Sequence, residues 1–131
     1  MSLVAYKTTP KTNSQLLQDI LDELTSHNAD ILSALVVSHE GLKVASGLPH
    51  IEDDTLALTA SDLVDMAEDF SKRLEHGHLN RILLEGQKRT TVIIRAGQRT
   101  LLAVSVPADA KLGILIHSMR HAADKIAALF D

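Results

Sequence analysis

The chain has 131 residues, a common size for one domain, and its net charge is −4 with histidine neutral. Hydrophobic residues make up 45% of the chain and aromatic residues only 2%, so we expect an aliphatic core and no platform for stacking nucleic-acid bases. The absence of cysteine excludes disulfides, thiolate zinc sites and a cysteine nucleophile.

The first segment, residues 1–12, shows little pattern and includes Pro10, so we predict a flexible N-terminal arm there. It has no basic leader followed by a long apolar run, and no later stretch is apolar enough to span a bilayer. We therefore expect a cytoplasmic protein. Residues 13–131 are predicted to form a single domain, because no repeat or linker interrupts them.

The first predicted helix covers residues 13–27. Thr12 followed by Gln15 matches a capping box, and leucine and isoleucine then recur at helical spacing. A hairpin is predicted next, from an apolar strand over residues 31–38 and a second strand over residues 42–46. Gly41 lies in the short connection, where the turn needs a positive φ.

A long middle helix is predicted to start at a cap formed by Asp53 or Asp54 and to end near His76, with Gly77 as its left-handed stop. Apolar residues recur along it every three or four positions, and this seam is predicted to face the core. The seam consists of Leu56, Ala60, Leu63, Ala67, Phe70 and Leu74.

Three strands are predicted after this helix, and the short turns between them indicate antiparallel pairing. They cover residues 79–85, 88–95 and 99–106, and a last helix runs from a cap at Asp109 to about Leu129. The order is α-ββ-α-βββ-α, and several strands are apolar at nearly every position. This combination predicts an α/β three-layer sandwich, a five-stranded antiparallel sheet with helices on both faces.

Charge is distributed unevenly in the second half of the chain. Residues 52–76 carry eight acidic and two basic side chains, whereas residues 77–106 carry five basic and one acidic side chain. Either these are two ordinary solvated faces, or they form a polarised surface that orients a charged partner.

Motifs for catalysis or nucleotide binding are not recognised. The turn at Gly86 has the wrong spacing for a phosphate-binding loop, and no nucleophile elbow occurs. His117 and His121 have the spacing of two metal ligands on a helix, but no third ligand is suggested nearby. We therefore predict no catalytic residue, no cofactor and no metal site, and we expect that the protein is not an enzyme.

The element order and several local segments resemble the Roadblock family, named after the dynein light chain roadblock. The apolar strand, the Glu40-Gly41 turn and the strand ending in Ala45-Ser46 look like the family's first hairpin, although aspartate is frequent there in place of Glu40. The other similar segments are residues 100–104, 110–113 and 119–123. The resemblance covers about residues 14–130 and implies the profilin-like layering of that family.

Members of this family form homodimers or heterodimers, and they regulate or scaffold Ras-like small GTPases or serve as light chains of motor complexes. The one-domain layout resembles the bacterial partner proteins of gliding-motility GTPases. The resemblance implies that two protomers pair through the middle helix and the edge strand after it. It therefore predicts a homodimeric, non-catalytic regulator or scaffold whose partner is a Ras-like small GTPase.

A second stripe of the middle helix consists of small side chains flanked by acids, and we interpret it either as the dimer contact or as a solvated face. Pairing about a centre near residue 67 would bring Asp62 close to Lys72 of the second chain. The edge strand over residues 79–85 would be protected by Arg81 or by pairing with a second protomer. The predicted dimer interface consists of Ala57, Ser61, Asp62, Val64, Glu68, Lys72, Arg81 and Leu83.

Two alternatives stay open. One is a sensory module that binds a small ligand between sheet and helix, as in similarly layered profilin-like or PAS-like folds, which requires a cavity with convergent polar groups. The other is a light-chain-type structural subunit of a motor or signalling complex. If the chain activates a GTPase through an arginine inserted in trans, none of its arginines can be singled out for that role.

Overall fold

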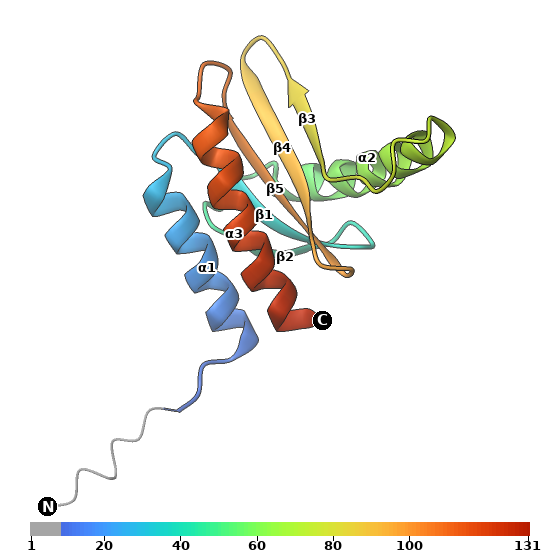
Figure 1. Cartoon of the computed structure of the whole chain (residues 1–131). Coiled ribbons are helices and arrows are strands. Elements are labelled where there is room, and N and C mark those ends of the chain that lie inside the picture. Colours follow the sequence, from blue (N-terminus) through green and yellow to red (C-terminus); the bar gives the residue numbers. More distant parts are fainter. Residues whose placement is uncertain (1–8) are drawn as a thin grey trace, which may run out of the picture.

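The computed structural model describes residues 9–131 (Figure 1). The first eight residues of the predicted arm lie outside the described residues. Residues 9–12 are exposed and belong to no helix or strand, and Lys11 forms an ion pair with Asp19 at 2.6 Å.

The described residues form one five-stranded sheet and three helices in the expected order. The elements are α1 (Asn13–His27), β1 (Ser33–Ser38), β2 (Lys43–Ser46), α2 (Asp53–Arg73), β3 (Arg81–Glu85), β4 (Arg89–Ala96), β5 (Thr100–Pro107) and α3 (Leu112–Phe130). The strand order is β2-β1-β5-β4-β3, and all neighbouring strands are antiparallel. The predicted fold class is confirmed, and β3 lies at an edge as predicted.

Two aliphatic layers lie on opposite faces of this sheet. The helices α1 and α3 lie side by side on one face, whereas α2 crosses the other face (Figure 1). On β4, Val92 and Ile94 belong to the layer under α1 and α3, and the intervening Ile93 belongs to the layer under α2. Because both faces are covered, the central strands are apolar at consecutive positions instead of alternating.

The helix α1 begins with the predicted capping box. Thr12 Oγ1 accepts a hydrogen bond from the N–H of Gln15 at 3.2 Å, and Gln15 Oε1 accepts one from the N–H of Thr12 at 2.9 Å. Leu17, Leu21 and Leu24 of this helix are buried in the layer that it shares with α3. A capping box satisfies two backbone donors that a helix start leaves unpaired, and this fixes where α1 begins.

The predicted caps of the other two helices are wrong. The N-cap of α2 is Glu52, which makes no side-chain cap bond, and Asp53 is buried with its Oδ2 accepting a hydrogen bond from the N–H of His50 at 3.1 Å. The helix α3 begins later than Asp109. The chain first turns after β5, where the N–H of Ala110 bonds to the carbonyl of Pro107 at 3.1 Å.

The end of α2 also differs from the prediction. The C-cap is Leu74 and the left-handed residue that follows it is Glu75, with a φ of 57°; Gly77 adopts a second positive φ of 82° in the loop beyond. The N–H of Glu75 bonds to the carbonyl of Lys72 at 3.2 Å, and the N–H of His76 bonds to the carbonyl of Ser71 at 2.8 Å. This pair of bonds is the Schellman arrangement that closes a helix end.

Candidate interaction surface

The small-residue stripe of α2 faces the protomer's own sheet. Ala57, Ala60 and Val64 are buried against β1 and β5, and Ser61 is 6% exposed. Ser61 Oγ donates a hydrogen bond to the carbonyl of His39 at 2.9 Å, which ties α2 to the loop between β1 and β2. The assignment of Ala57, Ser61 and Val64 to a contact with a second chain is therefore wrong, because they are enclosed within one protomer.

Close packing explains why the small side chains face inward. A Cβ added at Gly41 would lie 3.3 Å from the Cα of Leu58 and 3.3 Å from the Cβ of Ser61, so the hairpin loop and the helix backbone nearly touch. Large side chains on this face would hold the helix away from the sheet. A pattern that weights residues by hydrophobicity favours the neighbouring, larger seam, of which only Ala60 is fully buried, and this is the reason for the wrong prediction.

The seam of large apolar residues is instead exposed along the C-terminal half of α2. Phe70 is 59% exposed, Leu74 is 51% exposed and Met66 is 68% exposed, whereas Leu56 and Leu63 are half-buried. Figure 1 shows this half of the helix extending beyond the sheet. A helix of 21 residues is about 32 Å long, but five strands span only about 19 Å. The end of α2 therefore has no strand of its own protomer beneath it.

The edge strand β3 follows α2 after a loop over residues 74–80, and its Ile82 packs against the apolar layer under α2. Among the described residues it pairs with β4 alone, so its other side presents free backbone donors and acceptors. Ile82 and Leu84 lie opposite Ile93 and Thr91 of β4, on the face that α2 covers, and Leu84 is 55% exposed. We call the following set the α2–β3 surface: Leu63, Met66, Phe70 and Leu74 of α2 with Ile82 and Leu84 of β3.

The other residues of the predicted interface have different environments. Glu68 is held by Arg95 of β4, whose Nε donates to Glu68 Oε1 at 2.6 Å, and this ion pair fastens α2 to its own sheet. The remaining four are exposed: Asp62, Lys72, Arg81 and Leu83. Met66 and Leu84 were not predicted as contact residues, although the length of the middle helix relative to the width of the sheet indicated that part of the helix would extend beyond it.

A groove of about 570 Å³ borders the N-terminal half of α2. Leu56 and Thr59 line one side of it. Thr91 and Ser105 also line it, with their hydroxyl oxygens 2.7 Å from each other, and so do the polar or charged residues His50, Glu52 and Arg89. No helix within the described residues is both long and apolar enough to cross a membrane.

Comparison with known proteins gives consistent matches. The family model described as Roadblock/LC7 domain matches residues 16–105. Two uncharacterized proteins of Methanocaldococcus jannaschii are 33% and 32% identical to the chain over 101 residues, which is 76% of this chain and 88% and 85% of theirs.

Solved structures share the fold. The gliding protein MglB from Thermus thermophilus has a TM-score of 0.83 and 17% identity, covering 95% of each chain. A structure described as MglB with tetrameric arrangement has a TM-score of 0.84 and 18% identity, covering 95% of this chain and 94% of that one. A Roadblock/LC7 domain from Streptomyces avermitilis has a TM-score of 0.78 and 22% identity, covering 85% and 94%.

Proposed function

The chain belongs to the Roadblock/LC7 family, and we propose that it is a non-catalytic, dimeric regulator or scaffold that binds a Ras-like small GTPase. The observation that carries the proposal is the α2–β3 surface. Exposed apolar side chains on an overhanging helix lie beside a strand with an unpaired edge. Both features are unfavourable in water, and a second copy of the chain covers both at once.

The seam of α2 suits an antiparallel pair of helices related by a two-fold axis at Leu63. In such a pair, residue i of one chain meets residue j of the other, and j meets i. Leu56 and Phe70 are equally far from Leu63 along the chain, so each Phe70 lies opposite a Leu56 of the second copy. The groove beside Leu56 and Thr59 has room for the ring.

Charge supports the same antiparallel arrangement. The helix α2 begins with Asp53 and Asp54 and ends with Lys72 and Arg73, so antiparallel pairing brings ends of opposite charge together. With the axis at Leu63, the exposed Lys72 lies opposite the exposed Asp54 of the second copy. This pair replaces the one between Asp62 and Lys72 that a centre near residue 67 would give.

Family membership supports the GTPase part of the proposal, because Roadblock proteins regulate or scaffold Ras-like GTPases. The fold that the chain shares with the gliding protein MglB supports it further. In the proposed dimer, two α2 helices lie next to each other on one face and offer a polar outer surface to the partner. Residues 13–131 act as one Roadblock-type domain in this proposal.

The dimer is tested by measuring the molar mass of the purified chain with light scattering over a range of concentrations. We expect the wild-type chain to be a dimer and Phe70→Glu to be a monomer, because the substitution places a charge in the apolar contact, opposite Leu56 of the second copy. Ile51→Glu is the matched control, since Ile51 is 96% exposed and lies outside the α2–β3 surface. A monomeric wild type, or equal effects of the two substitutions, would contradict the proposed dimer.

The GTPase partner is tested by capture on the immobilised chain. Each Ras-like GTPase encoded in the same genome is purified and loaded with GDP or with a non-hydrolysable GTP analogue. We expect one of them to bind with a clear preference for one nucleotide state and to lose binding to Phe70→Glu but not to Ile51→Glu. Absence of binding by all of them would favour a light-chain-type structural subunit. GTP hydrolysis measured with and without the chain distinguishes an activator from a scaffold.

A further inference from the structure

The free edge strand β3 has the sequence Arg-Ile-Leu-Leu-Glu over Arg81–Glu85. A basic residue begins the strand, an acidic residue ends it, and three branched aliphatic residues lie between them. Read in the opposite direction, the strand presents the same aliphatic centre with its two charges exchanged. A strand of this kind is complementary to an antiparallel copy of itself, which is the requirement for an interface around a two-fold axis.

The two charged residues of β3 lie on the face of the sheet opposite to α2. Leu83 lies opposite Val92 of β4, whose side chain belongs to the layer under α1 and α3. Because alternate side chains of a strand share a face, Arg81 and Glu85 project from that face as well. Both are exposed, and within residues 9–131 neither takes part in an ion pair. Their charges are therefore available to a chain that lies along the open edge.

The backbone of β3 presents the same residues to the open edge. The N–H of Gly86 bonds to the carbonyl of Arg89 at 2.9 Å, in the register that continues along β3 and β4. In an antiparallel ladder, pairs of residues that bond to each other alternate with pairs that do not. The odd-numbered residues Arg81, Leu83 and Glu85 therefore turn their N–H and C=O groups away from β4, toward the open edge.

A two-fold axis perpendicular to the sheet allows few registers between two antiparallel copies of β3. One residue must lie opposite itself, because side chains that face each other across two strands lie on the same side of the sheet. An axis at Leu83 pairs all five residues of the strand. It places Ile82 opposite Leu84, and Arg81 opposite Glu85 of the second copy. An axis at Ile82 or Leu84 instead places one charged side chain opposite Leu83 and the other charged side chain opposite a residue beyond the strand.

We propose that Arg81 and Glu85 form two symmetric ion pairs across a β3–β3 junction centred on Leu83, and that these pairs make the chain bind a second copy of itself in preference to a different edge strand. The junction rests on the proposed dimer and adds to it the register and the residues that select the partner. Cross-strand pairs of opposite charge stabilise antiparallel strands, whereas like charges directly opposite each other destabilise them. Arg81 and Leu83 were predicted at the dimer interface, and Glu85 is the residue that this register adds.

The first test reverses these charges one at a time. In a dimer of Arg81→Glu, glutamates face each other in both cross-strand pairs, and in a dimer of Glu85→Arg, arginines do. We expect each single variant to dimerise at least roughly tenfold more weakly than the wild type, because two attractive pairs become repulsive. The double variant Arg81→Glu/Glu85→Arg restores opposite charges in both pairs and should dimerise like the wild type. Analytical ultracentrifugation measures all four dissociation constants.

The second test mixes the two single variants in equal amounts. A copy with glutamate at both positions then meets a copy with arginine at both positions, so both cross-strand pairs carry opposite charges. We expect the heterodimer of Arg81→Glu with Glu85→Arg to form in clear preference to either homodimer. Native mass spectrometry measures the three populations, because the two variants differ in mass.

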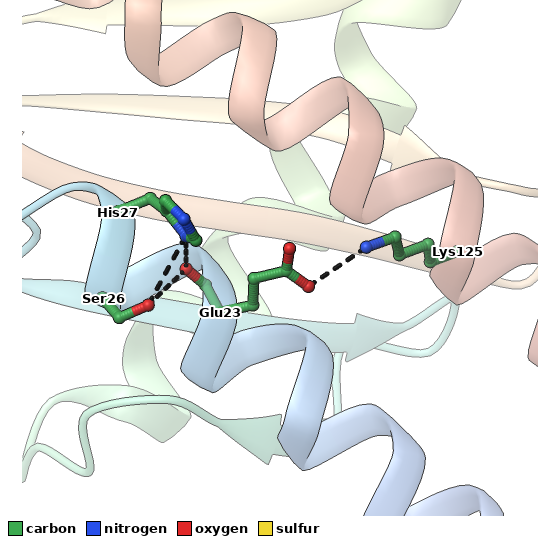
Figure 2. A network of polar contacts seen from close by, with 4 residues as sticks. All are labelled: Glu23, Ser26, His27 and Lys125. Carbon is green, nitrogen blue, oxygen red and sulfur yellow. Dashed lines mark hydrogen bonds and ion pairs between the residues drawn. The ribbon is translucent and has the colours of Figure 1, made fainter.

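The matched control is an exposed ion pair that lies within one protomer. Glu23 Oε2 accepts a hydrogen bond from Lys125 Nζ at 3.1 Å, and Figure 2 shows this pair joining α1 to α3. It lies on the face of the sheet opposite to α2, beside a groove that is also lined by His27, His117 and His121. Lys125→Glu and Glu23→Arg change the net charge as the two β3 variants do. Neither should alter dimerisation, and their mixture should show no preferred heterodimer.

Three results would overturn the junction while the proposed dimer stands. The first is a dimeric wild type whose dissociation constant is unchanged in both single variants. The second is a double variant that dimerises as weakly as the single ones, since pairing of opposite charges would then not be the cause. The third is a statistical mixture of homodimers and heterodimers from the two single variants. A monomeric wild type would instead contradict the proposed dimer itself, and the junction with it.

Discussion

Glu75 occupies a backbone conformation that a residue with a side chain adopts at a cost. Its φ of 57° lies in the left-handed region, where the Cβ approaches the following carbonyl. The two backbone bonds that close α2 require this conformation, so the strain persists in the native state. Gly77, two residues later, has a similar φ without that penalty.

We expect Glu75→Gly to raise the free energy of unfolding by up to about 1 kcal/mol, because removal of the Cβ strain exceeds the added freedom of the unfolded chain. Gly77→Ala is the converse substitution, because it adds a Cβ to a residue with a positive φ. A Cβ at Gly77 would meet nothing within 4 Å, so any destabilisation comes from backbone strain alone. Urea unfolding measures both variants, and a loss of stability in Glu75→Gly would refute the assignment of strain.

Substitutions on the buried and exposed faces of α2 test which face of this helix packs against the sheet. Ala60 is fully buried against the sheet, whereas Asp65 of the same helix is exposed. We expect Ala60→Leu to destabilise the fold by about 1–3 kcal/mol, because the larger side chain pushes the helix away from the sheet. Asp65→Leu should change stability by less than about 0.5 kcal/mol. Equal effects in denaturant unfolding would show that the inward face is assigned wrongly.

Element positions could largely be predicted from local signals. The capping box at Thr12 fixed the start of α1, and the glycine turns fixed the strands to within two residues. The ends of α2 and the start of α3 could not be predicted, because the residues that matter there bond to the backbone in ways that no residue type specifies. Glu75 in a left-handed conformation is one example, and buried Asp53 beside His50 is another.

The candidate surface could be predicted only in part. The edge position of β3 followed from the order of the strands, but the inward face of α2 did not follow from hydrophobicity. It depends on how closely a helix approaches a sheet, and that distance is a tertiary property. The same holds for His27, which lies beside His117 and His121 because α1 and α3 pack together.

At the scale of the whole molecule, the sheet separates two surfaces with different chemistry. The α2 face carries the exposed apolar seam and the free edge of β3, whereas the α1–α3 face carries a groove lined by His27, His117 and His121. A substitution on one face is expected to leave the other intact, since distant sites are usually independent.

The pairing of β1 with β5 has a consequence for the order in which the chain folds. These strands lie at the centre of the sheet, yet one is near the start of the sequence and the other near its end. During synthesis, the hairpin of β1 and β2 must wait with one edge unpaired until Thr100–Pro107 has emerged. Pairing over so large a sequence separation slows folding, and an open apolar edge attracts other chains in the meantime. The nascent chain is thus most exposed to aggregation just before its last strand and helix are complete.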